Sequence, residues 1–135
     1  MRCLGIDYGI ARIGLAFTDS TLDLILPLDA IDVRAISDPF SVIKNIVDER
    51  NIDEVVVGLP LRPDHSETEQ SKHTRNFIAK LNIALDKKIC TVDESFSSKE
   101  AGTYMTYDAY KDKSSGRLDS ASACVILSRF LKEVD

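Results

Sequence analysis

The pattern of apolar and polar positions predicts strands in the first part of the chain. Two apolar runs, Arg2–Asp7 and Arg12–Thr18, flank a turn that contains Gly9, which is typical of a β-hairpin. A third strand is expected within Leu24–Val33, where Pro27 either places it at the edge of a sheet or shortens it. The chain is therefore expected to open with three strands.

Helical periodicity follows these strands. The segment Ser37–Pro39 provides an N-cap and a first-turn proline for a helix that ends near Asn51 and whose apolar face carries Phe40, Ile43 and Val47. The spacing of Ser66 and Glu69 is that of a capping box, which predicts the start of a second helix. This helix runs through about Leu85, with one apolar stripe at Phe77, Leu81 and Leu85.

Short strands and further helices alternate in the rest of the chain. The β-branched run Val55–Val57 predicts a strand buried on both faces, as in a parallel sheet, and Gly58–Pro60 is expected to stop it. Another strand is expected at Lys88–Val92. A third helix is expected to start at Ser97–Glu100, where the capping-box spacing recurs, and a last helix runs over about Gly116–Lys132. The order predicts an α/β fold with a mixed sheet covered by helices.

The composition fits one domain of an ordinary globular protein, with 44% apolar and 29% charged residues in 135. The N-terminus lacks the stages of a signal peptide, and no apolar stretch approaches membrane-spanning length, so a cytoplasmic protein without a membrane partner is expected. The net charge of -5 counts against nonspecific adhesion to nucleic acid, although it does not exclude a nuclease, whose metal-binding carboxylates are themselves negative.

Two local basic groups depart from this acidic balance. Gln70–Lys88 contains five basic residues and one acid, and Lys111, Lys113 and Arg117 form a second group. Either group could contact phosphates or could be only a solvated face.

Residue spacing argues against several common kinds of site. Cys3, Cys90 and Cys124 lie far apart among apolar neighbours, which predicts reduced core thiols. His65 and His73 have no cysteine or further histidine at zinc-ligand spacing. The glycines form neither a GxGxxG fingerprint nor a Walker A sequence.

Acidic residues stand at three notable places, namely the ends of two predicted apolar strands and the apolar face of the last predicted helix. Asp7 closes the first strand, and Asp93 and Glu94 close the strand after Cys90. Such strand ends are the usual location of sites in open α/β sheets. Carboxylates are the ligands that magnesium and manganese prefer, so converging carboxylates could hold one or two such ions against a phosphodiester.

Asp119 is the third acidic position. In a helix it shares an apolar stripe with Ala123, Ile126 and Phe130. An unpaired carboxylate on such a stripe is costly to bury, so a cation, a basic side chain or protonation should match it. Asp119 could equally be a first-turn acid that the helix dipole favours.

Four motifs together carry a family resemblance: GIDYGIARIGLAFTD, VVVGLPL, TVDESFSS and RLDSASACVILSRFL. In this order they resemble the YqgF-type family of Holliday junction resolvases and pre-16S rRNA nucleases. The resemblance covers almost the whole chain and implies a single ribonuclease H-like nuclease domain at 1–135, with a mixed central sheet of about five strands flanked by helices.

The resemblance also implies roles for individual residues. Asp7, Glu94 and Asp119 match the family's acids and are expected to be both catalytic and metal-binding, with one or two Mg²⁺ or Mn²⁺ ions. Arg12 matches the basic residue of the first turn, and Gly58–Leu61 matches the loop beside the site. Phosphate contacts are expected from Arg12, Arg62, Lys113 and Arg117, although Arg12 and Arg62 could also be plain surface residues.

Two departures from the family pattern bear on activity. Ser95 stands where the family usually has arginine after Asp-Glu, and the segment DHSET lacks the glycines usual after the GLPL loop. Losing a guanidinium near a phosphate would weaken bidentate contact with the substrate. These departures bear on substrate and rate rather than on fold.

The favoured hypothesis is a metal-dependent endonuclease of structured nucleic acid that acts in 5′ processing of pre-16S rRNA, as a monomer or weak homodimer and in contact with ribosomal precursor particles. The alternatives are a Holliday junction resolvase acting on branched DNA, a non-catalytic ribosome-assembly factor, and a nucleotide-binding module. The last is weighed because a strand ending in DYG before a hairpin resembles the first phosphate loop of the actin, sugar-kinase and chaperone ATPases, which close two such domains around a nucleotide.

Overall fold

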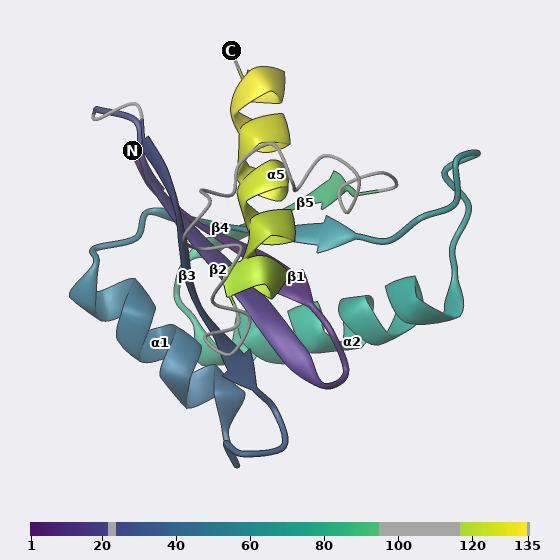
Figure 1. The fold of residues 1–135 in the computed structure, drawn as a ribbon, viewed down its shortest axis with the longest axis horizontal. Coiled ribbons are helices and arrows are strands. Elements are labelled where there is room, and N and C mark those ends of the chain that lie inside the picture. The colour runs from purple at the N-terminus through teal and green to yellow at the C-terminus, as the bar shows by residue number, and fades with distance from the viewer. Residues whose placement is uncertain (22–23, 95–116, 135) are drawn as a thin grey trace.

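The sheet has five strands in the order β3-β2-β1-β4-β5 (Figure 1). The computed structural model describes residues 1–21, 24–94 and 117–134, without the side chains of residues 117–119 and 133–134. Adjacent strands of the first three are antiparallel, whereas β1, β4 and β5 are mutually parallel. The strands are β1 (Arg2–Tyr8), β2 (Arg12–Asp19), β3 (Leu24–Asp32), β4 (Glu54–Leu59) and β5 (Lys88–Asp93). The predicted mixed sheet is confirmed.

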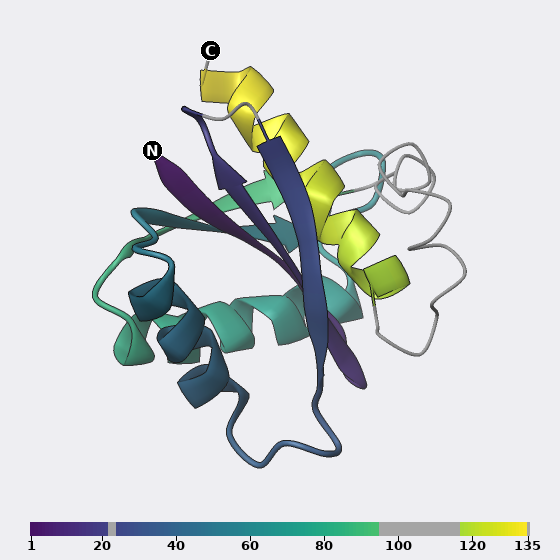
Figure 2. The same ribbon diagram turned by 60° about the vertical axis from the view of Figure 1, so that its left-hand side comes forward.

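Helices cover both faces of this sheet (Figure 2). One face packs on α1 (Pro39–Glu49) and α2 (Glu69–Ala84), and its cluster includes Leu4, Ile6, Val55 and Val57. The other face packs on α5 (Arg117–Val134), and its cluster includes Cys3, Val56, Val92 and Leu127. Because neighbouring residues of a strand point to opposite faces, the sheet is buried on both sides, as the valine run predicted.

Helix α1 begins as predicted. The Asp38 carboxylate accepts from the amides of Phe40 and Ser41, and Pro39 occupies the first turn. The helix ends at Glu49, two residues before the predicted Asn51, which has a left-handed backbone with φ of 53°.

The start of α2 differs from the prediction. The N-cap is Thr68, whose hydroxyl accepts from the Ser71 amide while the Ser71 hydroxyl accepts from the Thr68 amide. The predicted cap, Ser66, instead donates its hydroxyl and its amide to the Asp64 carboxylate. That local turn takes Ser66 out of the helix, so the Ser66–Glu69 capping box is wrong.

Two further boundaries differ slightly from the prediction, and the edge-strand alternative for Pro27 is confirmed. Gly58 and Leu59 belong to β4 instead of stopping it, and Tyr8 extends β1 beyond Asp7. Pro27 lies inside β3, which is an edge strand of full length, with a register irregularity opposite the Ile13–Leu15 stretch of β2. The predicted helix start at Ser97–Glu100 lies outside the described residues.

The three cysteines are free thiols. Burial raises the pKa of Cys3 to about 11 and that of Cys124 to about 12, so both thiols stay protonated at neutral pH. Cys90 is only partly buried and donates to the Glu54 carboxylate at 3.1 Å. Within the described ranges, no helix is long and apolar enough to cross a membrane.

Arg2 and Asp19 join the start of β1 to the end of β2. The Arg2 guanidinium donates to the Asp19 carboxylate at 3.2 Å, and Thr21 donates to the same carboxylate through its hydroxyl and its amide. The hydrogen bonds from Thr21, and then the Arg2 contact, lower the pKa of Asp19 below its ordinary value of 3.8.

We expect Asp19→Asn to lower the free energy of unfolding at pH 7. Because folding lowers the pKa of Asp19, its ionised form stabilises the fold above the ordinary aspartate pKa, and this contribution disappears as the pH falls through the lower folded value. The difference between wild type and Asp19→Asn, measured by urea unfolding from pH 7 to pH 2, should therefore shrink below about pH 4. Asp48→Asn on the exposed surface of α1 is the control and should show a smaller difference at pH 7.

Candidate active site

Asp7 lies on the α5 side of the sheet. Cys3 belongs to the cluster beneath α5, whereas Leu4 and Ile6 belong to the cluster on the opposite face. Since residues of a strand alternate between faces, Asp7 shares the side of Cys3 and Gly5. It is half-buried, one residue from the end of β1, and its antiparallel partner on β2 is Gly14.

Glu94 follows the last residue of β5 and is 9% exposed. Its amide donates to the Leu59 carbonyl of β4 at 3.0 Å. Its carboxylate lies directly over Gly58, because a Cβ atom on Gly58 would meet both Cδ and Oε2 of Glu94 at 2.9 Å. The same Cβ would meet Ile126 Cδ1 of α5 at 2.5 Å, so the Glu94 carboxylate occupies the space between β4 and α5.

Gly58 brings Asp7 and Glu94 together. Ile6 pairs with Val57 in the parallel register of β1 and β4, so the next residues, Asp7 and Gly58, lie side by side. Because the Glu94 carboxylate lies over Gly58, it lies on the same face of the sheet as Asp7, over the neighbouring strand. Two of the three predicted carboxylates therefore meet on one face, at the carboxyl ends of parallel strands.

The first turn of α5 approaches the same end of the sheet. The Ser120 hydroxyl accepts from the Leu15 amide at 3.1 Å and donates to the Leu28 carbonyl at 2.6 Å. Leu15 is next to Gly14, the partner of Asp7, so the backbone of residue 119 is held near the Asp7 end of β1.

The predicted apolar stripe of α5 is confirmed for three of its four positions. Ala123, Ile126 and Phe130 all lie in the cluster beneath the helix. Position 119 continues that stripe toward the N-terminus of the helix. The side chain of Asp119 is outside the described part of the structure, and its role stays a prediction.

The four predicted phosphate contacts fall in different environments. Arg12 is exposed at the first residue of β2, beside the end of β1 that carries Asp7. Arg62 is exposed as well, and its guanidinium donates to the Glu67 carbonyl and to the Ser66 hydroxyl within its own loop. Lys113 and the side chain of Arg117 lie outside the described residues.

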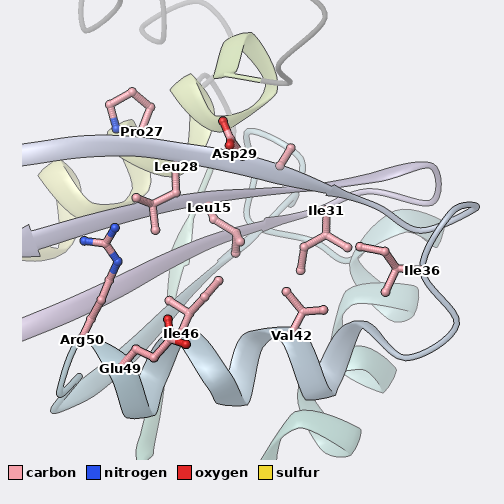
Figure 3. A pocket seen from close by; sticks show the side chains of 11 residues that line it. Leu15, Pro27, Leu28, Asp29, Ile31, Ile36, Val42, Ile46, Glu49 and Arg50 are labelled. Carbon is pink, nitrogen blue, oxygen red and sulfur yellow. The ribbon is translucent and has the colours of Figure 1, made fainter.

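A further carboxylate on this side of the sheet was missed by the sequence analysis. Asp29 is exposed on β3 and points away from α1, on the α5 side of the strand (Figure 3). It lies at the register irregularity opposite Gly14, the glycine that pairs with Asp7. No cap or motif marks this position, because the irregularity in strand pairing is what places it there.

An open groove of about 480 Å³ lies between β3 and α1, and Asp29 is among the residues that line it (Figure 3). Leu28, Ile31, Val42 and Ile46 are among the mostly apolar residues that line it. Neither Asp7 nor Glu94 borders it, so we do not place the chemistry there.

The donor set at the strand ends suits a hard divalent cation. Glu94 is an almost fully buried carboxylate, and Gly58 leaves the space that its oxygens occupy. Within the described residues, no three His, Cys, Asp or Glu side chains form a metal-binding group, and the predicted set of Asp7, Glu94 and Asp119 stays a prediction. The predicted third ligand is Asp119.

Comparison with protein families gives one match along nearly the whole chain. The profile of the RuvX family, described as a Holliday junction resolvase, matches residues 1–133. A protein of Chlorobium luteolum named "Putative pre-16S rRNA nuclease" is 36% identical, over 98% of this chain and 94% of its own length. A Campylobacter jejuni protein of the same name is also 36% identical, over 96% of this chain and 98% of its own length.

Solved structures with a similar fold include two resolvases. Thermus thermophilus RuvC in complex with a Holliday junction substrate superimposes with a TM-score of 0.58 and 14% identity, over 93% of this chain and 89% of RuvC. The fowlpox virus resolvase bound to Holliday junction DNA gives 0.59 and 16% over the whole of both chains. The fold is ribonuclease H-like, as the sequence motifs implied.

We expect Gly58→Ala to displace the Glu94 carboxylate while leaving the protein folded. The atoms nearest the added Cβ are the ends of two side chains, Ile126 and Glu94, so the loss of stability should be about 1 kcal/mol. Calorimetry should show Mn²⁺ affinity lowered at least about tenfold.

Gly5→Ala is the matched comparison for stability. Its Cβ would meet the backbone carbonyl of Ala123 at 2.9 Å and Leu127 Cγ at 2.6 Å, so it should cost more stability, about 3 kcal/mol. Equal Mn²⁺ affinities in Gly58→Ala and wild type would remove Glu94 from the site.

Proposed function

This chain belongs to the RuvX family, and on that premise we propose that it is a metal-dependent endonuclease that hydrolyses phosphodiester bonds of structured nucleic acid, in 5′ processing of pre-16S rRNA. The observation that carries the proposal is the buried carboxylate of Glu94 over Gly58, beside Asp7 at the ends of parallel strands. Carboxylate oxygens gathered on one face at strand ends are the ligands that Mg²⁺ and Mn²⁺ prefer.

Asp7, Glu94 and Asp119 would hold one or two Mg²⁺ or Mn²⁺ ions. Ions held there would supply an activated water molecule and would stabilise the charge of the leaving oxygen. The protein's own part is to hold the backbone that carries these ligands. The Glu94 amide donates a hydrogen bond to the Leu59 carbonyl, and the hydrogen bonds of Ser120 to β2 and β3 hold the backbone next to Asp119. Held ligands lose little freedom when the ion binds.

Positive charge near the strand ends would position the substrate. Arg12 extends from the hairpin end that carries Asp7 and would bind a phosphate next to the one that is cleaved. Lys113 and Arg117 would add contacts from the chain before α5, and Arg62 from the loop after β4. Such contacts fix the position of the nucleic acid without reading its sequence.

The substrate class follows from the relatives. The curated relatives carry a pre-16S rRNA nuclease name, which favours ribosomal RNA precursors as substrate and precursor particles as partner, in the cytoplasm. The family description and the junction-bound RuvC favour a second candidate, cleavage of four-way DNA junctions. We propose a single nuclease domain that works as a monomer or weak homodimer.

We expect Asp7→Asn, Glu94→Gln and Asp119→Asn each to reduce Mn²⁺-dependent cleavage at least about 100-fold, because each removes one charged ligand. Cleavage of precursor 16S rRNA, single strands and four-way junctions should be compared for each variant, with thermal unfolding as the check on folding. Cleavage by wild type with none in the variants is the expected result.

Two other outcomes of this panel are informative. Cleavage of junctions alone would select the resolvase candidate. A wild type that binds no Mn²⁺ and cleaves none of these substrates would contradict the nuclease and leave a non-catalytic assembly factor.

We expect Arg12→Gln to weaken binding of nucleic acid to a similar degree for every sequence, and to reduce the slope of log K against log salt by about one. The measurement is fluorescence anisotropy with a labelled substrate at several salt concentrations. Lys44→Gln on exposed α1, on the opposite face of the sheet, is the control and should leave the slope unchanged. Equal slopes for Arg12→Gln and wild type would exclude a phosphate contact at Arg12.

A further inference from the structure

The peptide group that joins Asp93 to Glu94 is bound at both of its polar atoms. Its carbonyl oxygen, on Asp93, accepts from Nη1 of Arg129 on α5 at 2.7 Å. Its N–H, on Glu94, donates to the Leu59 carbonyl of β4 at 3.0 Å. Because a peptide group is planar and stiff, holding both atoms fixes the plane of this peptide and the position of the Glu94 Cα atom, from which the side chain leaves the backbone.

The side chain of Asp93 is held as well. Its Oδ2 lies 2.7 Å from Nδ1 of His65, in the loop between β4 and α2. His65 is mostly exposed and has a left-handed backbone with φ of 67°, which is unfavourable for a residue with a Cβ. A costly backbone conformation persists where the surrounding contacts enforce it, and at such places it often serves a site.

The loop that presents His65 is fixed by a series of contacts. Arg75 of α2 binds the Glu67 carboxylate through two nitrogens, at 2.6 and 3.1 Å. The Glu67 carbonyl accepts from the Arg62 guanidinium, and the Thr68 hydroxyl donates to the Pro60 carbonyl at 2.8 Å. These contacts hold both ends of the loop, so His65 meets Asp93 from a fixed base.

We propose that His65 and Arg129 are positioning residues that set the Glu94 carboxylate by holding Asp93 from two sides. The inference rests on the proposed function, in which Glu94 binds the cation. His65 acts from the loop and Arg129 from α5, so a motion of either element would move the ligand. Neither side chain needs to touch the substrate or the ion for this role.

His65→Gly tests the contribution of the imidazole without changing the backbone conformation. Glycine adopts a positive φ without strain, so the substitution removes only the contact with Asp93. Asn51→Gly is the matched control, because Asn51 is the other non-glycine residue with positive φ among those the structure describes. Arg129→Gln and Arg129→Lys form a second pair: the lysine keeps a charged donor at the end of a long side chain, whereas the amide of the shorter glutamine falls short of the Asp93 carbonyl.

Two measurements decide the proposal: amide hydrogen exchange at Glu94 by NMR, and Mn²⁺ affinity by calorimetry. In His65→Gly and Arg129→Gln we expect exchange at Glu94 to be at least about tenfold faster and Mn²⁺ binding about tenfold weaker, with unchanged exchange in the core of β4. Arg129→Lys should recover part of both changes, and Asn51→Gly should match wild type.

The proposal is overturned if His65→Gly and Arg129→Gln both match Asn51→Gly in Glu94 exchange. It is also overturned if their exchange rises while Mn²⁺ affinity stays at the wild-type value. A wild type that neither binds Mn²⁺ nor cleaves nucleic acid would contradict the proposed function instead. Faster Glu94 exchange in the two variants would then still show that His65 and Arg129 hold Asp93.

Discussion

The close approach of α5 to β1 and β4 is the constraint on which the site depends. Two glycines permit it: a Cβ on Gly5 would meet Ala123 and Leu127, and a Cβ on Gly58 would meet Ile126 and the Glu94 carboxylate. A side chain at Gly5 would push the helix away from the sheet, and one at Gly58 would displace Ile126 and the Glu94 carboxylate. The same contact therefore packs one face of the core and brings three chain segments to one end of the sheet.

Local patterns were enough to predict most of the fold. The hairpin, the valine strand and the α5 stripe each follow from periodicity within a few residues, and the structure confirms them. The start of α2 could not be chosen in this way, because Ser66 and Thr68 are both good caps. The Asp64–Ser66 turn and the left-handed backbone of His65 decide between them.

The ends of the predicted strands pointed to the carboxylates Asp7 and Glu94, but not to the residues that hold them in place. Asp7 and Glu94 were found because apolar runs stop near them, and the structure places both beside Gly58. Gly58 itself was predicted to end its strand. Its contact with Glu94 joins residues far apart in the sequence, so no local pattern shows it. For the same reason no local pattern links Asp93 to His65 and Arg129, which come from a loop and a helix.

The central claim is that Asp7, Glu94 and Asp119 share one cation between the strand ends and α5. The most direct test is a crystal structure of the protein soaked in Mn²⁺, with anomalous differences collected at the manganese edge. The account predicts a peak within coordination distance of carboxylate oxygens from all three residues. A peak bound elsewhere, or Asp119 turned away from Asp7 and Glu94, would contradict it.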